Sequence, residues 1–253
     1  MALLHVHYFS QALGVQTEVE VILPEVQQGI GVNAAGDEAL PRVLYLLHGY
    51  SDDQTIWQRR TSVERYAAAH NLAVIMPGVN HSFYCNEAWG ERYWDFVAQE
   101  LPTVMHRFFR LSDKPEDTFV AGLSMGGYGA LKLALNFPER FGAAASFSGA
   151  SDITWLSKRH PEQWKRIFGG KSPRGTECDL YHVMKANGAA AHKPRLYVSC
   201  GTADFLYDAH KKIVPALKKA GWDVTAHDEP DAVHEWGFWD QEIRKFIGMM
   251  FAE

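Results

Sequence analysis

FVAGLSMGGYGALKLAL, residues 119–135, places a serine between two glycines at a sharp change in sequence pattern. The apolar residues 119–121 predict a buried strand, and the apolar spacing over 131–135 predicts a packed helix. Between them, residues 122–126 fit the pattern G-x-S-x-G. A strand before this pattern and a helix after it form the context that presents a serine nucleophile on a tight turn. The alternative is that Ser124 only caps the helix, and the flanking glycines favour the nucleophile.

The rest of the chain alternates short apolar runs with helical patterns. Runs that predict strands buried on both faces of a sheet occur at 43–47, 72–76, 118–122, 143–147 and 196–200, with a last short strand at 223–228. Helical patterns occur at 56–69, 93–109, 125–136, 207–220 and 235–251. Because this alternation requires crossover connections, we expect an α/β fold with a mostly parallel central sheet and helices on both faces.

The start of the chain has a different pattern. Residues 2–9 alternate apolar and polar side chains, and a second alternating run begins at Thr17 and is ended by Pro24. These two runs predict a pair of antiparallel strands. With no repeat or low-complexity tract beyond them, we expect residues 1–253 to form a single domain.

The composition excludes several classes of function. The 253 residues are 47% hydrophobic and 22% charged, and the formal net charge of −5 indicates neither nucleic acid nor a membrane as a partner. No apolar run reaches about 18 residues and the first residues lack a basic stretch, so we expect a cytoplasmic protein. The three cysteines have no metal-binding spacing, which predicts free thiols and neither a metal nor another cofactor.

Candidates for the base and the acid that a serine nucleophile requires follow the last two predicted strands. Asp204 follows the strand at 196–200, and His234 lies in the loop before the final helix. Ligands gather at the carboxyl ends of parallel strands, so both side chains should lie beside Ser124. We predict that His234 is the base and that Asp204 orients it. The weaker alternatives are Asp208 and Asp231 for the acid and His227 for the base.

Two backbone groups are predicted to stabilise a developing oxyanion. One is the N–H of Met125, which directly follows the serine at the start of a helix. The other is the N–H of Tyr50, in the loop His48-Gly49-Tyr50 after the strand at 43–47.

Three quoted segments together resemble one known family: GLSMGGYGALKLAL, LYLLHGYSDDQTIW and HEWGFWD. They are similar to the esterase D-like esterases, and within that group to bacterial tributyrin esterases of the acetyl-esterase type. The resemblance extends over nearly the whole chain. It implies an α/β-hydrolase fold and a serine carboxylesterase that acts on short acyl chains. By position it maps the nucleophile, acid and base to Ser124, Asp204 and His234, and the oxyanion donors to Tyr50 and Met125.

The substrate pocket is predicted from aromatic side chains near the active edge. Residues 149–194 lack a buried strand and are predicted to form an inserted cap, whose exposed aromatic residues could support a homo-oligomer. Trp89, Phe205 and Trp236 are predicted to contact the substrate, and bulky walls favour acetyl to butyryl groups. Because the related branches share the triad, a thioesterase of the S-formylglutathione hydrolase type and a feruloyl or acetyl-carbohydrate esterase remain alternatives. An alcohol acceptor in place of water would make the protein an acyl transferase.

Overall fold

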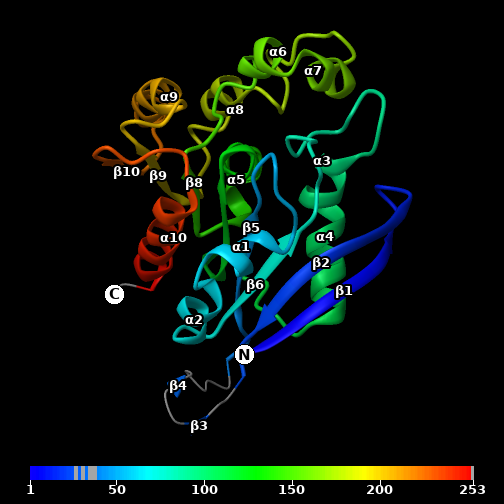
Figure 1. Cartoon of the computed structure of the whole chain (residues 1–253), viewed down its shortest axis with the longest axis vertical. Coiled ribbons are helices and arrows are strands. Elements are labelled where there is room, and N and C mark those ends of the chain that lie inside the picture. Colours follow the sequence, from blue (N-terminus) through cyan, green and yellow to red (C-terminus); the bar gives the residue numbers. More distant parts are fainter. Residues whose placement is uncertain (26–27, 30–31, 34–38, 252–253) are drawn as a thin grey trace.

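The computed structural model describes residues 1–25, 28–29, 32–33 and 39–251, and its centre is an eight-stranded sheet (Figure 1). The strands lie in the order β1-β2-β6-β5-β7-β8-β9-β10. Their bounds are β1 Ala2–Ser10, β2 Val15–Leu23, β5 Arg42–Leu47, β6 Leu72–Pro77, β7 Thr118–Leu123, β8 Ala143–Phe147, β9 Arg195–Gly201 and β10 Val224–Glu229. Neighbours from β6 to β10 pair in parallel, which confirms the predicted mostly parallel sheet. A separate antiparallel pair consists of β3 Gln28–Gly29 and β4 Val32–Asn33.

Helices cover the sheet and connect its strands. Their bounds are α1 Ile56–Arg60, α2 Val63–Ala68, α3 Tyr93–Asp95, α4 Leu101–Phe108, α5 Met125–Asn136, α6 Trp155–Arg159, α7 Pro161–Phe168, α8 Leu180–Ala186, α9 Tyr207–Lys219 and α10 Trp236–Met250. A π-helical turn, η1 Phe96–Glu100, joins α3 to α4, and 3-10 turns lie at η2 Pro115–Asp117 and η3 Pro138–Arg140.

The opening strands extend the parallel sheet by an antiparallel pair, as the alternating sequence predicted. β1 pairs antiparallel with β2, and β2 pairs antiparallel with β6, where Val19 lies opposite Pro77. Along β1 the side chains alternate between half-buried and exposed, because successive residues of a strand point to opposite faces.

Each face of the sheet packs against its own layer of helices. Along β5, Val43, Tyr45 and Leu47 belong to the apolar cluster that contains the residues of α5. Leu44 and Leu46 point the other way, into the cluster that contains the residues of α10. This is the two-layer cover that an all-apolar strand predicts.

Two predicted helices are interrupted, one by a contact that is distant in sequence and one near a proline. The pattern over 56–69 forms two helices because the N–H of Ser62 donates to Asp240 Oδ1 of α10 at 2.9 Å instead of continuing the first. The pattern over 93–109 contains η1 because Pro102 has no N–H to donate to Ala98 O. That carbonyl accepts Nη1 of Arg140 instead, at 2.6 Å.

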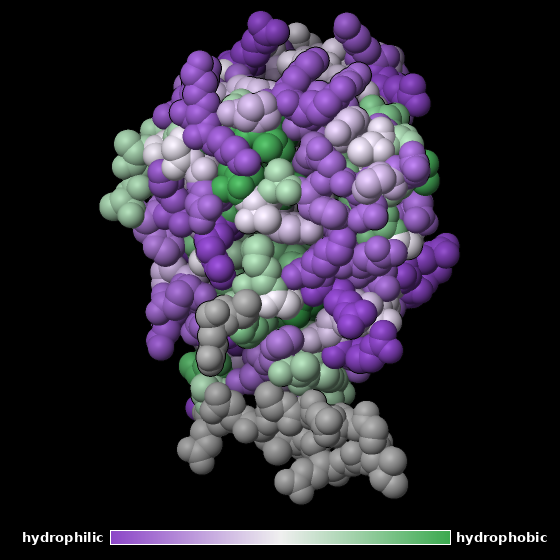
Figure 2. All heavy atoms as spheres, turned by 90° about the vertical axis from the view of Figure 1, so that its left-hand side faces the viewer, coloured by the Kyte–Doolittle hydropathy of each residue, from purple (hydrophilic) through white to green (hydrophobic). Residues whose placement is uncertain are grey.

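Residues 149–194 connect β8 to β9 through α6, α7 and α8, and they contain no strand. Figure 1 shows α6 and α7 at the top of the molecule, beyond α5 and α8. At the far edge of the sheet, β10 carries His227, Asp228 and Glu229, and charged residues protect an edge strand from pairing with other chains. The face with β10, α9 and α10 is mainly hydrophilic, with smaller groups of hydrophobic side chains (Figure 2).

Candidate active site

Ser124 occupies a strained turn between β7 and α5. Its φ of 52° and ψ of −114° lie in a region that L-residues rarely adopt. The turn is held because the Ser124 N–H donates to Phe147 O at 2.9 Å and the Ser124 carbonyl accepts the N–H of Ala150 at 3.1 Å. A strained serine on a strand–turn–helix corner has the geometry of a nucleophile elbow, which supports a functional hypothesis for Ser124.

The two glycines of the motif allow this corner to pack tightly. A Cβ on Gly122 would lie 2.4 Å from the carbonyl oxygen of Gly126. A Cβ on Gly126 would lie 2.3 Å from the carbonyl oxygen of Leu47, at the end of β5. Both distances are far below van der Waals contact with rigid backbone, so the turn requires glycine at both positions.

Asp204 and His234 come together from two neighbouring loops. His234 Nδ1 lies 2.8 Å from Asp204 Oδ2, and Asp204 Oδ1 accepts the N–H of Leu206 at 2.8 Å. The side chain of Asp204 is 0% exposed, whereas that of His234 is 19% exposed. Burial raises the pKa of Asp204, but the hydrogen bond and charge of His234, aided by Leu206, leave this pKa below its usual value. Asp204 is therefore an anion at neutral pH and fixes the Nδ1–H tautomer of the histidine.

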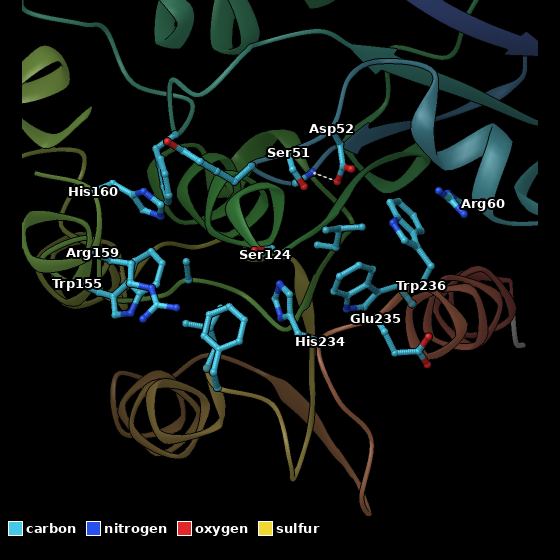
Figure 3. Close-up of a pocket in the computed structure, with 18 residues that line it drawn as sticks. Ser51, Asp52, Arg60, Ser124, Trp155, Arg159, His160, His234, Glu235 and Trp236 are labelled. Carbon is cyan, nitrogen blue, oxygen red and sulfur yellow. Dashed lines mark hydrogen bonds between the residues drawn. The ribbon is translucent and has the colours of Figure 1, made fainter. Parts of the chain in front are cut away.

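Ser124 and His234 line the same cavity, and Figure 3 shows the imidazole ring beside Ser124. The alternative acids lie elsewhere. Asp208 is 84% exposed and pairs with Lys211 at 2.9 Å, and the N–H of Asp231 donates to the hydroxyl of Thr202. The alternative base His227 pairs with Glu229 at 2.8 Å on β10. The structure thus joins His234 to Asp204 and places His234 in the same cavity as Ser124.

The predicted oxyanion donors lie on the loop after β5 and at the start of α5. Met125 is the first residue of α5, so its N–H has no acceptor within the helix. Tyr50 lines the cavity directly after Gly49, whose N–H donates to Asp52 Oδ2 at 3.2 Å. Among the described residues, neither the Tyr50 nor the Met125 N–H donates to another protein group.

Buried His48 shapes this loop, a role that the sequence did not indicate. Its Nδ1 lies 2.7 Å from Gly49 O, and its Nε2 accepts the N–H of Val79 at 3.0 Å. Burial lowers the pKa of His48 to about 4, so the ring is neutral near pH 7 and donates only from Nδ1. The only feature of the sequence that could have indicated this role is the position of His48 between an apolar strand and a glycine.

The cavity has a volume of about 640 Å³, and six of its 18 lining residues are Phe, Tyr or Trp. Ring centroids lie 4.7 Å apart for Tyr50 and His160, and 4.6 Å apart for Phe205 and His234. Trp155 stacks on Phe205 with centroids 6.3 Å apart. Charged groups line the cavity as well: Asp52, Arg60, Arg159 and Glu235.

The predicted substrate contacts have different positions in the structure. Phe205 and Trp236 line the cavity, as Figure 3 shows for Trp236. Trp89 does not: it is 61% exposed, and its N–H donates to the carbonyl of Arg166 on α7 at 3.2 Å. A tryptophan that does line the cavity is Trp155, which lies on α6 within residues 149–194.

One cluster of potential metal ligands occurs in the described part of the chain, formed by His227, Glu229 and Glu242. The ammonium of Lys245 lies 2.7 Å from Glu242 Oε1 and 3.1 Å from His227 Nε2. Because this lysine already supplies a positive charge to the cluster, these residues do not indicate a metal centre.

Comparisons with known proteins identify close similarities. A family model described as "Putative esterase" matches residues 10–246. An acetyl esterase from Caldicellulosiruptor saccharolyticus is 30% identical over 255 residues, covering 96% of this chain and 96% of the relative. The substrate-bound structure of FphF, a fluorophosphonate-binding serine hydrolase from Staphylococcus aureus, has a TM-score of 0.90 and 36% identity, covering 100% of this chain and 99% of the other.

A second solved structure, the S-formylglutathione hydrolase FrmB from Staphylococcus aureus, has a TM-score of 0.86 and 37% identity, covering 98% of each chain. Together these similarities confirm the α/β-hydrolase fold that the sequence resemblance implied. No helix among the described residues is long and apolar enough to cross a membrane.

Proposed function

This chain belongs to the esterase family whose model it matches and is a carboxylic ester hydrolase, and on that premise we propose that Ser124 is its nucleophile. In this proposal His234 is the general base and Asp204 orients it. The observation that carries the proposal is the 2.8 Å contact between buried Asp204 and His234, because His234 lines the same cavity as strained Ser124.

Acylation begins when His234 Nε2 takes the proton of Ser124 as its Oγ attacks the ester carbonyl carbon. The carbonyl oxygen becomes an anion and accepts hydrogen bonds from the N–H groups of Tyr50 and Met125. Collapse of the tetrahedral intermediate breaks the bond to the alcohol oxygen, and His234 donates its proton to that oxygen. The alcohol leaves, and the acyl group remains on Ser124.

Deacylation repeats these steps with water as the nucleophile. His234 removes a proton from the water, and the oxyanion forms again between the same two donors. His234 then returns the proton to Ser124 Oγ as the bond to the acyl carbon breaks, and the acid leaves. An alcohol that replaced water here would give a new ester, so the ratio of free acid to new ester measures transferase activity.

We propose acetyl to butyryl groups as the preferred acyl range. The proposal is supported by the aromatic walls of the cavity, where Phe205 lies 4.6 Å from His234 and Trp155 stacks on Phe205. Bulky rings close to the reacting carbon leave room for a short chain. The similarity to an acetyl esterase supports the same range.

A thioester is the second candidate substrate, favoured by the similarity to an S-formylglutathione hydrolase. The same triad serves both substrates, because a thiolate leaves without the proton that an alcohol needs. Kinetics on p-nitrophenyl acetate and on S-formylglutathione separate the two: the preferred substrate has the higher kcat/KM.

The proposal is tested by the hydrolysis of p-nitrophenyl esters from acetate to octanoate, with methyl ferulate as a further substrate. Ser124→Ala should abolish activity, and Ser51→Ala, which alters another serine of the cavity wall, should retain it. An optimum at acetate to butyrate supports the short acyl site, whereas a preference for methyl ferulate would point to a feruloyl esterase. Full activity of a folded Ser124→Ala protein would refute the nucleophile.

A further inference from the structure

A buried cluster that the proposed mechanism does not use lies between α5 and two loops. Cys85 belongs to the loop after β6, Cys178 directly precedes the N-cap of α8, and Lys132 lies on α5. The two sulfur atoms are 3.5 Å apart. Cys85 is fully buried and Cys178 is 5% exposed, so only Cys178 is close to solvent.

Lys132 brings a positive charge into this interior. Its side chain is fully buried, and Nζ donates to Tyr84 O at 3.0 Å and lies 4.0 Å from the ring centroid of Trp94. Cys85 Sγ lies 3.5 Å from Nζ, and although burial opposes them, the charges of the two thiols and of Glu177 raise the pKa of Lys132. A buried charge is costly unless it is compensated, so the thiols lie where an anion is favoured.

The two thiols have opposite acidities. A hydrogen bond from Cys85 and the charge of Lys132, acting against burial and the charge of Glu177, lower the pKa of Cys178. Burial raises the pKa of Cys85 well above its usual value. These opposite shifts favour a Cys178 thiolate that accepts a hydrogen bond from the Cys85 thiol across the 3.5 Å contact, and the thiolate is the reactive form of cysteine.

We propose that Cys85 and Cys178 form an oxidation site at which a hydroperoxide converts the two thiols to a disulfide. The Cys178 thiolate attacks one oxygen of hydrogen peroxide, the O–O bond breaks, and the products are Cys178 sulfenic acid and hydroxide. Cys85 sulfur then attacks Cys178 sulfur. The S–S bond forms, the S–OH bond breaks, and the departing hydroxide takes the Cys85 proton to give one water. The hydroxide from the first step takes a proton from solvent, which balances the proton that Cys178 lost on ionisation, so one peroxide is reduced to two waters.

The geometry requires only a small movement. The sulfur atoms must close from 3.5 Å to a bond of about 2.05 Å. The bond would join the loop that lines one side of the cavity, through Phe83, to the segment before α8. Tyr84, next to Cys85, donates its hydroxyl to His48 O at 2.9 Å, so the disulfide would also restrain the loop after β5.

The test is the reaction of the whole purified chain with a few equivalents of hydrogen peroxide, followed by intact-mass and peptide mass spectrometry without reductant. We expect a loss of about 2 Da, a Cys85–Cys178 linked peptide and reversal by dithiothreitol. In Cys85→Ser, a dimedone probe should label Cys178 as the sulfenic acid. Lys132→Met should slow the oxidation at least about tenfold, because the thiolate fraction falls.

The matched control is Cys200→Ser, which removes a buried thiol whose pKa burial raises to about 12. This variant should form the disulfide at the wild-type rate. Absence of the linked peptide in wild type, or dimedone labelling at Cys200 instead of Cys178 in Cys85→Ser, would overturn the proposal. Because these readouts do not use hydrolysis, they are independent of the proposed esterase mechanism.

Discussion

Asp204→Asn tests how the buried carboxylate controls the proposed base. Asp204 accepts two hydrogen bonds, from Leu206 N–H and from His234 Nδ1, each at 2.8 Å. Asparagine can keep its oxygen on the Leu206 N–H, but its NH₂ group then faces His234. To accept a hydrogen bond from this NH₂ group, Nδ1 of the ring must be unprotonated. The proton is then on Nε2, where the base needs a lone pair.

This tautomer removes the acceptor for the Ser124 proton, and the neutral amide no longer stabilises the imidazolium. We expect kcat to fall about 10³- to 10⁴-fold, which corresponds to about 4 to 5.5 kcal/mol of transition-state stabilisation. The assay is steady-state hydrolysis of p-nitrophenyl acetate, with circular dichroism and Tm to verify the fold.

The matched control is Asp208→Asn, because this acid is 84% exposed and contacts only Lys211 among the ion pairs of the described residues. Its kcat should stay within about twofold of wild type. A folded Asp204→Asn protein with kcat within tenfold of wild type would refute the assigned role of Asp204.

Three further predictions follow from the packing. The pKa of His48 falls from 6.5 to about 4 on folding, so His48 contributes stability above pH 6.5 that is lost as the pH drops toward 4. In urea titrations, His48→Gln should therefore remove roughly 3 kcal/mol of pH dependence in the free energy of unfolding over that interval. An unchanged pH dependence would contradict this. Gly126→Ala would place a Cβ 2.3 Å from Leu47 O and should lower the free energy of unfolding by more than about 3 kcal/mol. Gly248→Ala would place a Cβ with no atom within 4 Å and should raise this free energy by up to about 1 kcal/mol. Similar effects at both sites would refute the steric explanation. Phe205→Ala should shift the preferred p-nitrophenyl ester toward longer chains by removing a cavity wall, and an unchanged profile would exclude Phe205 from the acyl site.

The sheet could be predicted from the sequence because a strand that is buried on both faces consists mainly of apolar residues. Residues 43–47 form a continuous apolar run, residues 143–147 are apolar except for Ser146, and both correspond to parallel strands buried on two faces. The break between α1 and α2 could not be predicted in the same way. The break before Ser62 depends on Asp240, 178 residues away in sequence, and a local pattern contains no information about such a partner.

In the candidate site, the proposed catalytic residues could be predicted from the sequence, whereas the aromatic residues of the cavity could not. Ser124, Asp204 and His234 could be selected because each follows a predicted strand, and parallel strands place their carboxyl ends at one edge of the sheet. Trp89 and Trp155 could not be ranked, since both lie in segments without a strand. Which of the two reaches the cavity depends on how residues 149–194 fold back, and their action as a cap stays a prediction.

The most direct test of the central claim is the mass of the protein after a fluorophosphonate probe has reacted with the folded chain. We expect one adduct per chain, located on the peptide that contains Ser124 and absent from Ser124→Ala. An adduct on another serine, or labelling of Ser124→Ala at the wild-type rate, would contradict it.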